Sequence, residues 1–266
     1  MKILANHAHL MPPTVPGGWW PAGDATLLLK HLDACGIERT IVFPPFACQM
    51  DNNMAEANRW ALREVKSHAD RFIPAGTVFP LASDVLEVLQ LLHDEGVRWL
   101  KIHPSVDVHD IADSQAEPFY TKAEELGTVL DYHTGPHATR LALAKPEKFD
   151  DLAWSHPELK LVFEHLGGRV YVEEFTAILG NHREQTYGGL TSIFDSDVNY
   201  LWFLTAERIG EIVTGIGARQ FIFGLDFPWN SISATQRHLR IIDSLDIPPS
   251  DKDLIRGGNL SRLLEL

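Results

Sequence analysis

The chain has 266 residues, of which 45% are apolar and 22% are charged, and its formal net charge is −13 at pH 7. This composition can bury a sizeable core, while the negative charge and the lack of a lysine and arginine cluster argue against a nucleic-acid partner. No apolar run is long enough for a membrane span, and the N-terminus carries no signal-peptide pattern. Cys35 and Cys48 lack a Cys-x-x-Cys spacing, so neither a disulfide framework nor a thiolate metal site is expected. We therefore expect a cytoplasmic protein.

Apolar runs bounded by turn residues predict eight β-strands, each followed by helical sequence. The strands are expected at residues 2–10, 39–44, 72–78, 97–103, 128–133, 159–165, 191–194 and 220–226. The helices are expected at residues 24–36, 53–69, 83–95, 117–126, 146–155, the first half of 171–189, 204–216 and 234–245. Asp24 is expected to cap the first helix and Asn259 a short last one.

Strands that recur at intervals of roughly 30 residues, with helices between them, predict a single (β/α)₈ TIM barrel over residues 1–266. A doubly wound open sheet has the same alternation of strands and helices. However, no Gly-x-Gly-x-x-Gly or Walker-type loop follows any of the predicted strands. One α/β barrel domain is the better interpretation, and its chemistry is expected at the carboxyl ends of the strands.

The first strand ends in two histidines, His7 and His9. Residues i and i+2 of a strand lie on the same face, so the two imidazoles can point the same way. Such a pair could form half of a metal site, or it could be two hydrogen-bonded histidines at a strand end. The ends of the later strands bear on this choice.

Further histidines and one carboxylate stand at the ends of later predicted strands. These residues are Lys101, His103, His133, His165 and Asp226. Imidazoles with one carboxylate suit Zn²⁺, and Mn²⁺, Fe²⁺ or Co²⁺ are alternatives. A metal-activated water could then act at neutral pH, with a carboxylate taking its proton and an unligated histidine polarising a substrate carbonyl. The histidines on predicted helices and loops are expected to be solvated or partly buried; they are His31, His68, His93, His109, His156, His182 and His238.

Five short motifs resemble the signatures of the amidohydrolase-related family. They are His7-Ala8-His9, Lys101-Ile102-His103-Pro104, His133-Thr134-Gly135, His165-Leu166-Gly167-Gly168 and Gly224-Leu225-Asp226-Phe227-Pro228. Residues 69–72 and 257–263 also resemble family sequences, so the resemblance covers the whole chain. This branch of the amidohydrolase superfamily includes aminocarboxymuconate-semialdehyde decarboxylase and many small metal-dependent hydrolases. Five motifs in the same order are specific, although any one alone would be weak.

The resemblance implies one divalent metal, expected to be zinc. Its ligands would be His7, His9, His133 and Asp226. His165 would be the catalytic histidine that does not bind the metal, and Asp226 would also carry a proton. The family often has serine or threonine before this aspartate, where the present chain has Leu225, so one polar contact is expected to be missing.

Three further residues leave alternatives open. Some relatives carboxylate a lysine at the position of Lys101 and use it to bridge two metal ions; otherwise Lys101 would be a buried amine paired with a carboxylate. His103 could bind a second metal or donate a supporting hydrogen bond. Asp131 lies on the same strand face as His133 and could orient an imidazole or be purely structural.

The motifs permit two reactions. The first is hydrolysis of a lactone, ester or amide carbonyl in a small carboxylate-bearing or cyclic substrate; the second is non-oxidative decarboxylation by a lyase on the same metal. A barrel that binds a ligand without turnover is a third alternative, although buried polar groups would then destabilise it. Trp19 and Trp229 could stack on a flat substrate, and Arg169 could bind a carboxylate. The expected partner is a small molecule, and a homodimer remains open.

Overall fold

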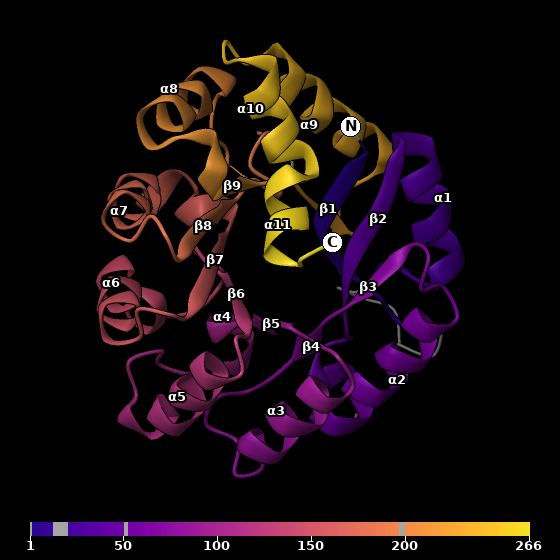
Figure 1. The fold of residues 1–266 in the computed structure, drawn as a ribbon, viewed down its shortest axis with the longest axis vertical. Coiled ribbons are helices and arrows are strands. Elements are labelled where there is room, and N and C mark those ends of the chain that lie inside the picture. Colours follow the sequence, from indigo (N-terminus) through magenta and orange to yellow (C-terminus); the bar gives the residue numbers. More distant parts are fainter. Residues whose placement is uncertain (1, 13–20, 51–52, 197–199) are drawn as a thin grey trace.

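A computed structural model describes residues 2–12, 21–50, 53–196 and 200–266, and its strands form a parallel barrel surrounded by helices (Figure 1). The strands are β1 (Ile3–His9), β2 (Ile37–Phe43), β3 (Phe72–Pro74), β4 (Gly76–Thr77), β5 (Trp99–Ile102), β6 (Val129–His133), β7 (Lys160–Glu164), β8 (Thr186–Gly189), β9 (Phe221–Ile222) and β10 (Gly224–Phe227). Among the residues that the structure describes, no helix is long and apolar enough to cross a membrane.

The ten strands occupy eight positions in one barrel. Hydrogen-bonded neighbours follow the orders β10-β1-β2-β3 and β4-β5-β6-β7-β8-β9. Only Ala75 separates β3 from β4, and only Phe223 separates β9 from β10, so each pair is one interrupted barrel strand. The Ala75 N–H donates to the Val42 carbonyl and the Asn6 N–H to the Phe223 carbonyl, which continues the ladder across both interruptions. The predicted TIM barrel is therefore confirmed.

Helices follow the strands and form the outer layer (Figure 1). They are α1 (Ala25–Cys35), α2 (Met54–Lys66), α3 (Val85–Asp94), α4 (Pro104–Asp107), α5 (Glu117–Glu125), α6 (Pro146–Ser155), α7 (Gly168–Asn181), α8 (Ala206–Ile216), α9 (Ile232–Ser244), α10 (Pro249–Asp253) and α11 (Asn259–Leu263). One apolar cluster fills the space between strands and helices, and a second lies inside the barrel, where Trp99 and Phe43 are fully buried. Leu260 of α11 belongs to the second cluster, so α11 covers one end of the barrel interior.

The seventh barrel strand is β8, and the expected strand at 191–194 was wrong. Residues 191–194 have the β-branched and aromatic composition of a strand, whereas β8 ends in two glycines. The pairing explains the glycine at position 189, because Gly189 lies opposite Glu164 of β7. A Cβ on Gly189 would lie 2.4 Å from Glu164 Oε2, which is too close for any larger residue.

The two predicted helix caps had different outcomes. Asp24 caps α1, because its carboxylate accepts a hydrogen bond from the Leu27 N–H at 2.9 Å. Asn259 is not a cap, since the preceding residues 254–258 are already helical. Its side-chain amide instead donates to the Ala218 and Phe221 carbonyls, at 2.7 and 2.8 Å, and ties α11 to the barrel.

Candidate active site

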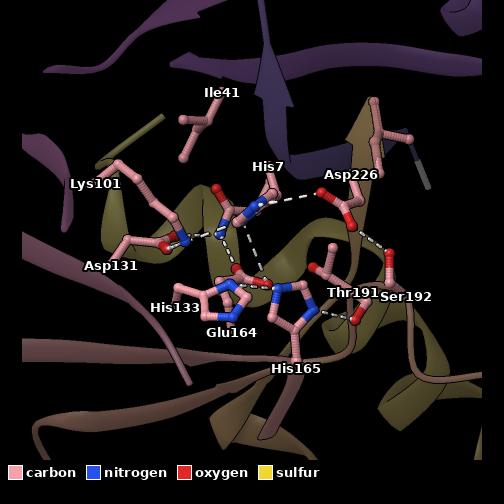
Figure 2. Close-up of polar contacts among 12 residues, drawn as sticks. His7, Ile41, Lys101, Asp131, His133, Glu164, His165, Thr191, Ser192 and Asp226 are labelled. Carbon is pink, nitrogen blue, oxygen red and sulfur yellow. Dashed lines mark hydrogen bonds and ion pairs between the residues drawn. The ribbon is translucent and has the colours of Figure 1, made fainter. Parts of the chain in front are cut away.

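Three of the residues predicted to bind a metal lie at the carboxyl end of the barrel. His7 and His9 end β1, and Asp226 lies on β10, which pairs directly with β1. His7 Nε2 lies 3.4 Å from His9 Nε2. It also lies 3.6 Å from Asp226 Oδ1 (Figure 2). Two ligand atoms of a tetrahedral zinc site with bonds of about 2.1 Å lie about 3.4 Å apart. Each of these two distances therefore suits a pair of ligands to one ion, although His7, His9 and Asp226 do not offer three ligand atoms that all lie within 4.8 Å of one another.

The backbone at these positions departs from regular structure. His7, His165 and Asp226 have φ angles of 67°, 65° and 54°, in the left-handed region that few residues other than glycine adopt. The register of β1 also shifts between Asn6 and Ala8 against β10, and between Ala5 and Ala8 against β2. Left-handed residues of this kind cost about 1–3 kcal/mol each and cluster at functional sites. Here they coincide with three residues that the sequence singled out.

Two carboxylates lie on the far side of the His7 ring. His7 Nδ1 lies 3.5 Å from Glu164 Oε2 and 3.9 Å from Asp131 Oδ1. Burial lowers the pKa of His7 well below its usual value, so the ring is neutral and carries one proton. The neighbouring carboxylates place that proton on Nδ1, which leaves a lone pair on Nε2 facing His9 and Asp226.

Below His7 lies a buried polar network that centres on Asp131. The Asp131 carboxylate accepts hydrogen bonds from Lys101 Nζ at 3.0 Å, from Trp99 Nε1 at 3.0 Å and from the Asn6 amide at 2.7 Å. The Asn6 amide also donates to Glu164. Burial raises the pKa of both Asp131 and Glu164. Lys101 is thus observed as the buried amine paired with a carboxylate, and Asp131 as a residue that contacts the His7 side of the site.

A hydrogen-bond chain defines the tautomers of His165 and His133 (Figure 2). His165 Nδ1 lies 2.8 Å from the Thr191 carbonyl, which can only accept, so His165 carries its proton there. Its Nε2 therefore accepts from His133 Nδ1 at 3.2 Å. His133 Nε2 is then a lone pair, and it is buried without a hydrogen-bond partner. A buried lone pair of this kind fits a metal ligand.

His133 does not lie in direct contact with the other predicted ligands. Among the described residues, two groups of three side chains have one ligand atom each within 4.8 Å of one another, namely His7–Asp131–Glu164 and His103–His133–His137. The His165 ring connects His133 to His7, with ring centres 4.7 and 5.6 Å away respectively. In the first group Asp131 is already paired with Lys101, so we interpret it as the support of His7.

Asp226 receives its polar contact from another loop. Ser192 Oγ donates to Asp226 Oδ2, and the Asn230 amide donates in turn to Ser192 Oγ at 3.0 Å. This hydroxyl replaces the one that Leu225 cannot provide. Burial raises the pKa of Asp226 to about 6. Asp226 Oδ2 is therefore anchored, while Oδ1 faces the histidines.

Aromatic side chains surround the histidine rings. Trp202 stacks on His165 with ring centres 4.1 Å apart, and Phe46 stacks on His9 at 5.1 Å. The edge of Trp229 also contacts His9, at 5.3 Å, which places this predicted residue at the mouth of the site. Trp19 lies outside the described residues. The exposed Arg169 guanidinium packs over the Tyr200 ring at 4.5 Å rather than against the buried histidines.

The sequence analysis missed four residues that shape this site: Asn6, Glu164, Ser192 and Trp202. Asn6 and Glu164 each precede a predicted site histidine, so regular strand alternation would turn them away from it. The left-handed backbone at His7 and His165 breaks that alternation. The only available signal was their adjacency to motif histidines. No motif marked Ser192 or Trp202.

The geometry agrees with the family comparison. The chain belongs to the amidohydrolase family, since the family model described as Amidohydrolase (Amidohydro_2) matches residues 6–266. This family is enzymatic and metal-dependent, and its members include amidohydrolases and decarboxylases. A search of curated proteins finds no match.

Solved structures share the fold along the whole chain. An uncharacterized TIM-barrel protein from Bordetella bronchiseptica has a TM-score of 0.80 at 20% identity, with 100% of this chain and 99% of that chain covered. The 2,6-dihydroxybenzoate decarboxylase from Rhizobium has a TM-score of 0.73 at 18% identity, with 99% and 98% covered. A dihydroxybenzoic acid decarboxylase from Polaromonas, solved with manganese and the inhibitor 2-nitroresorcinol, has a TM-score of 0.73 at 14% identity, with 100% and 97% covered. At these identities the likeness shows the fold alone.

Proposed function

We propose that this protein is a metal-dependent hydrolase that cleaves a carbonyl compound (a lactone, ester or amide) at the barrel mouth. The observation that carries the proposal is the approach of His9 Nε2 and Asp226 Oδ1 to His7 Nε2, at 3.4 and 3.6 Å. Neutral imidazoles and a carboxylate are a ligand set for zinc or manganese, and each of these two distances suits a pair of ligands to one ion. With His133 Nε2 as a fourth donor, the set is the one that the family resemblance implies.

The bound ion would act as a Lewis acid, activating a water molecule and a carbonyl oxygen. The protein's own residues orient and transfer protons around it. Glu164 keeps the His7 proton on Nδ1, and Thr191 keeps the His165 proton on Nδ1. Asp226 holds Oδ2 against Ser192 and presents Oδ1 to the site, where it can accept the proton of the attacking water and return it to the leaving group.

The surroundings of the site favour a flat, uncharged substrate. Phe46, Trp202 and Trp229 provide apolar faces beside His9 and His165. Arg169, which the sequence analysis considered for binding a carboxylate, packs on Tyr200, and the buried Lys101 is paired with Asp131. An aromatic or cyclic lactone or ester meets these constraints. The carboxylate-bearing substrate considered from the sequence finds no support in these contacts.

Decarboxylation of an aromatic acid is the second candidate. Two of the solved relatives are named as decarboxylases of dihydroxybenzoates, and their fold covers this whole chain. The same ligand set could bind a carboxylate through the metal alone. Hydrolysis is preferred because Lys101 is paired with Asp131 and Arg169 packs on Tyr200, so neither of these two cations faces such a carboxylate.

The experiment measures metal content and then reaction products. Purified protein is analysed for bound metal, stripped with a chelator, and reloaded with Zn²⁺ or Mn²⁺ before incubation with dihydrocoumarin, an aryl acetate, an anilide and a dihydroxybenzoate. We expect one bound ion per chain and release of an acid from the lactone or ester. Release of CO₂ with no hydrolysis would select the decarboxylase, and neither metal nor turnover would select a binding protein.

A matched variant controls the metal analysis. His182 lies at the end of α7 and pairs with Asp150 at 2.9 Å, away from the barrel mouth. The His182→Asn variant should bind metal as the wild type does, whereas His9→Asn should not. Equal metal content in the two variants would contradict the assigned ligand set.

A further inference from the structure

We propose that His103 donates a hydrogen bond from Nε2 to the substrate carbonyl oxygen, as a neutral ring whose tautomer the main chain fixes. The proposal rests on the hydrolase function above and assigns the group that would stabilise the developing negative charge. The sequence left His103 as a second metal ligand or a supporting residue. The contacts of its ring decide between these roles.

The main chain fixes the proton of His103 on Nε2. His103 ends β5 at the N-cap of α4, and its Nδ1 accepts the Val106 N–H at 3.3 Å. The Val106 N–H also donates to the His103 carbonyl at 3.0 Å, so one N–H is shared between two acceptors, as is common at helix ends. A backbone N–H can only donate, so Nδ1 must present a lone pair. A neutral ring then carries its single proton on Nε2.

Ring stacking excludes His103 and His133 as joint ligands of one ion. Their ring centres lie 3.9 Å apart, and their planes differ by only 11°. A metal bonded to an imidazole nitrogen lies close to the plane of that ring. Two parallel planes at this separation share no such position. The grouping of His103, His133 and His137 is therefore not a second metal site in this arrangement, and His103 is left as a donor.

Three other histidines of the site have protons that face protein groups. The His7 Nδ1 lies 3.5 Å from Glu164 Oε2, the N–H of His165 faces the Thr191 carbonyl, and that of His133 faces His165. The sequence predicts an unligated histidine that polarises the substrate carbonyl, and the family resemblance makes His165 the unligated catalytic histidine, but the only proton of His165 faces the Thr191 carbonyl. This role therefore passes to another ring.

His103 is placed to take that role. Its ring packs between His133 and Phe46, and the residue is only 6% exposed. In the part of the chain that the structure describes, no acceptor lies within hydrogen-bonding distance of His103 Nε2. A substrate oxygen would supply the acceptor that this N–H lacks among the described residues. A neutral imidazole whose Nδ1 accepts a backbone N–H can act as an electrophile toward a carbonyl.

The test uses the metal-loaded full chain and the His103→Asn variant. Asparagine keeps an acceptor for the Val106 N–H but is too short to place a donor where Nε2 lies. We expect kcat for dihydrocoumarin to fall by about 10²- to 10³-fold, as for the loss of one oxyanion donor. Metal content and melting temperature should stay as in the wild type, because the cap is kept and no ligand is lost.

A long-range ¹H–¹⁵N correlation spectrum reads the tautomer directly. We expect the His103 proton on Nε2 and a shift of that proton when coumarin, a slowly hydrolysed lactone, is added. A proton on Nδ1, loss of metal in His103→Asn, an unchanged kcat, or no shift with bound coumarin would each overturn the proposal.

These results separate His103 from the proposed function itself. If the wild type releases CO₂ from a dihydroxybenzoate and does not hydrolyse the lactone, the hydrolase proposal fails. The same variant is then assayed for CO₂ release, and a comparable loss of rate would still support a donor role for His103. If the wild type turns over no substrate, the role of His103 is judged from its tautomer, the metal content of His103→Asn and the proton shift on addition of coumarin.

Discussion

The buried histidines of this protein form two groups that differ in how their protons are held. At the barrel mouth, the N–H groups of His133 and His165 are hydrogen-bonded, and His7 Nδ1 lies 3.5 Å from the Glu164 carboxylate, although it makes no hydrogen bond of good geometry. His109 and His238 are equally buried in the outer layers, yet neither ring nitrogen of either residue has a hydrogen-bond partner among the described residues. Burial is common to both groups. We call the first group directed, because each of its rings faces a polar partner, and the second group undirected.

The largest loss of activity is expected when the acid that faces the directed histidines is removed. Asp226→Asn keeps the shape of the side chain but removes its ability to accept a proton at Oδ1. We expect kcat/KM of the metal-loaded enzyme to fall by about 10²- to 10⁴-fold, the range for loss of general acid–base catalysis. The assay is dihydrocoumarin hydrolysis at matched metal content. Turnover at the wild-type rate would contradict the proton-carrying role of Asp226.

A smaller effect is expected when an acceptor of a directed proton is altered. Glu164→Gln retains an oxygen near His7 Nδ1 but removes the carboxylate charge. The affinity for Zn²⁺ should fall by about 10- to 100-fold, because outer carboxylates make a histidine ligand more basic and fix its tautomer. Competition with a fluorescent chelator measures this affinity.

An effect of Glu164→Gln on folding must be separated from the effect on the metal. The glutamine fits the same space opposite Gly189, so the metal-free variant should melt close to the wild type. Unchanged zinc affinity in a folded variant would mean that Asp131 alone orients His7.

His165→Ala tests the second directed proton. Without His165 Nε2, the His133 ring loses the acceptor that keeps its proton on Nδ1. The variant should still bind metal, with zinc affinity lowered by about 10-fold, the lower end of the range for such supporting contacts. Isothermal titration with Zn²⁺ checks this. Complete loss of binding would instead make His165 a ligand, as the two-metal alternative requires.

The sequence could predict the directed group only in part. Apolar strands that end in histidine or aspartate located His7, His133, His165 and Asp226 at one end of a barrel, because all parallel strands of a barrel present their carboxyl ends together. Strand alternation also paired His7 with His9. The periodic pattern therefore captured the barrel and most of the polar rim.

Local backbone geometry explains what the sequence could not give. The acceptors Glu164 and Asn6 lie beside site histidines only because positive φ angles at His165 and His7 interrupt strand alternation. The seventh strand was misplaced because β8 ends in two glycines, residues of low strand propensity, although the Glu164 carboxylate requires one of them, Gly189. Ser192 reaches Asp226 from a loop, a contact between residues distant in sequence. None of these features produces a periodic pattern in the sequence.

The undirected histidines are expected to have the smallest effect on the free energy of unfolding at neutral pH and a measurable effect at acidic pH. Burial lowers the pKa of His238 to about 4, against an unfolded value of about 6.5. Above pH 6.5 both states are neutral and His238 adds no pH dependence. As the pH falls from 6.5 toward 4, the unfolded chain binds the proton first, so the free energy of unfolding decreases, by about 2 kcal/mol at pH 5 from this residue.

His238→Phe keeps the aromatic contact with Phe194 and removes the titrating group. The difference in unfolding free energy between variant and wild type should be constant above pH 7 and should shift in favour of the variant by about 2 kcal/mol at pH 5. Urea titrations at a series of pH values measure it. A difference that stays constant down to pH 5 would show that His238 gains a proton as readily when folded as when unfolded. In that case the distinction between the two groups would not extend to their protonation.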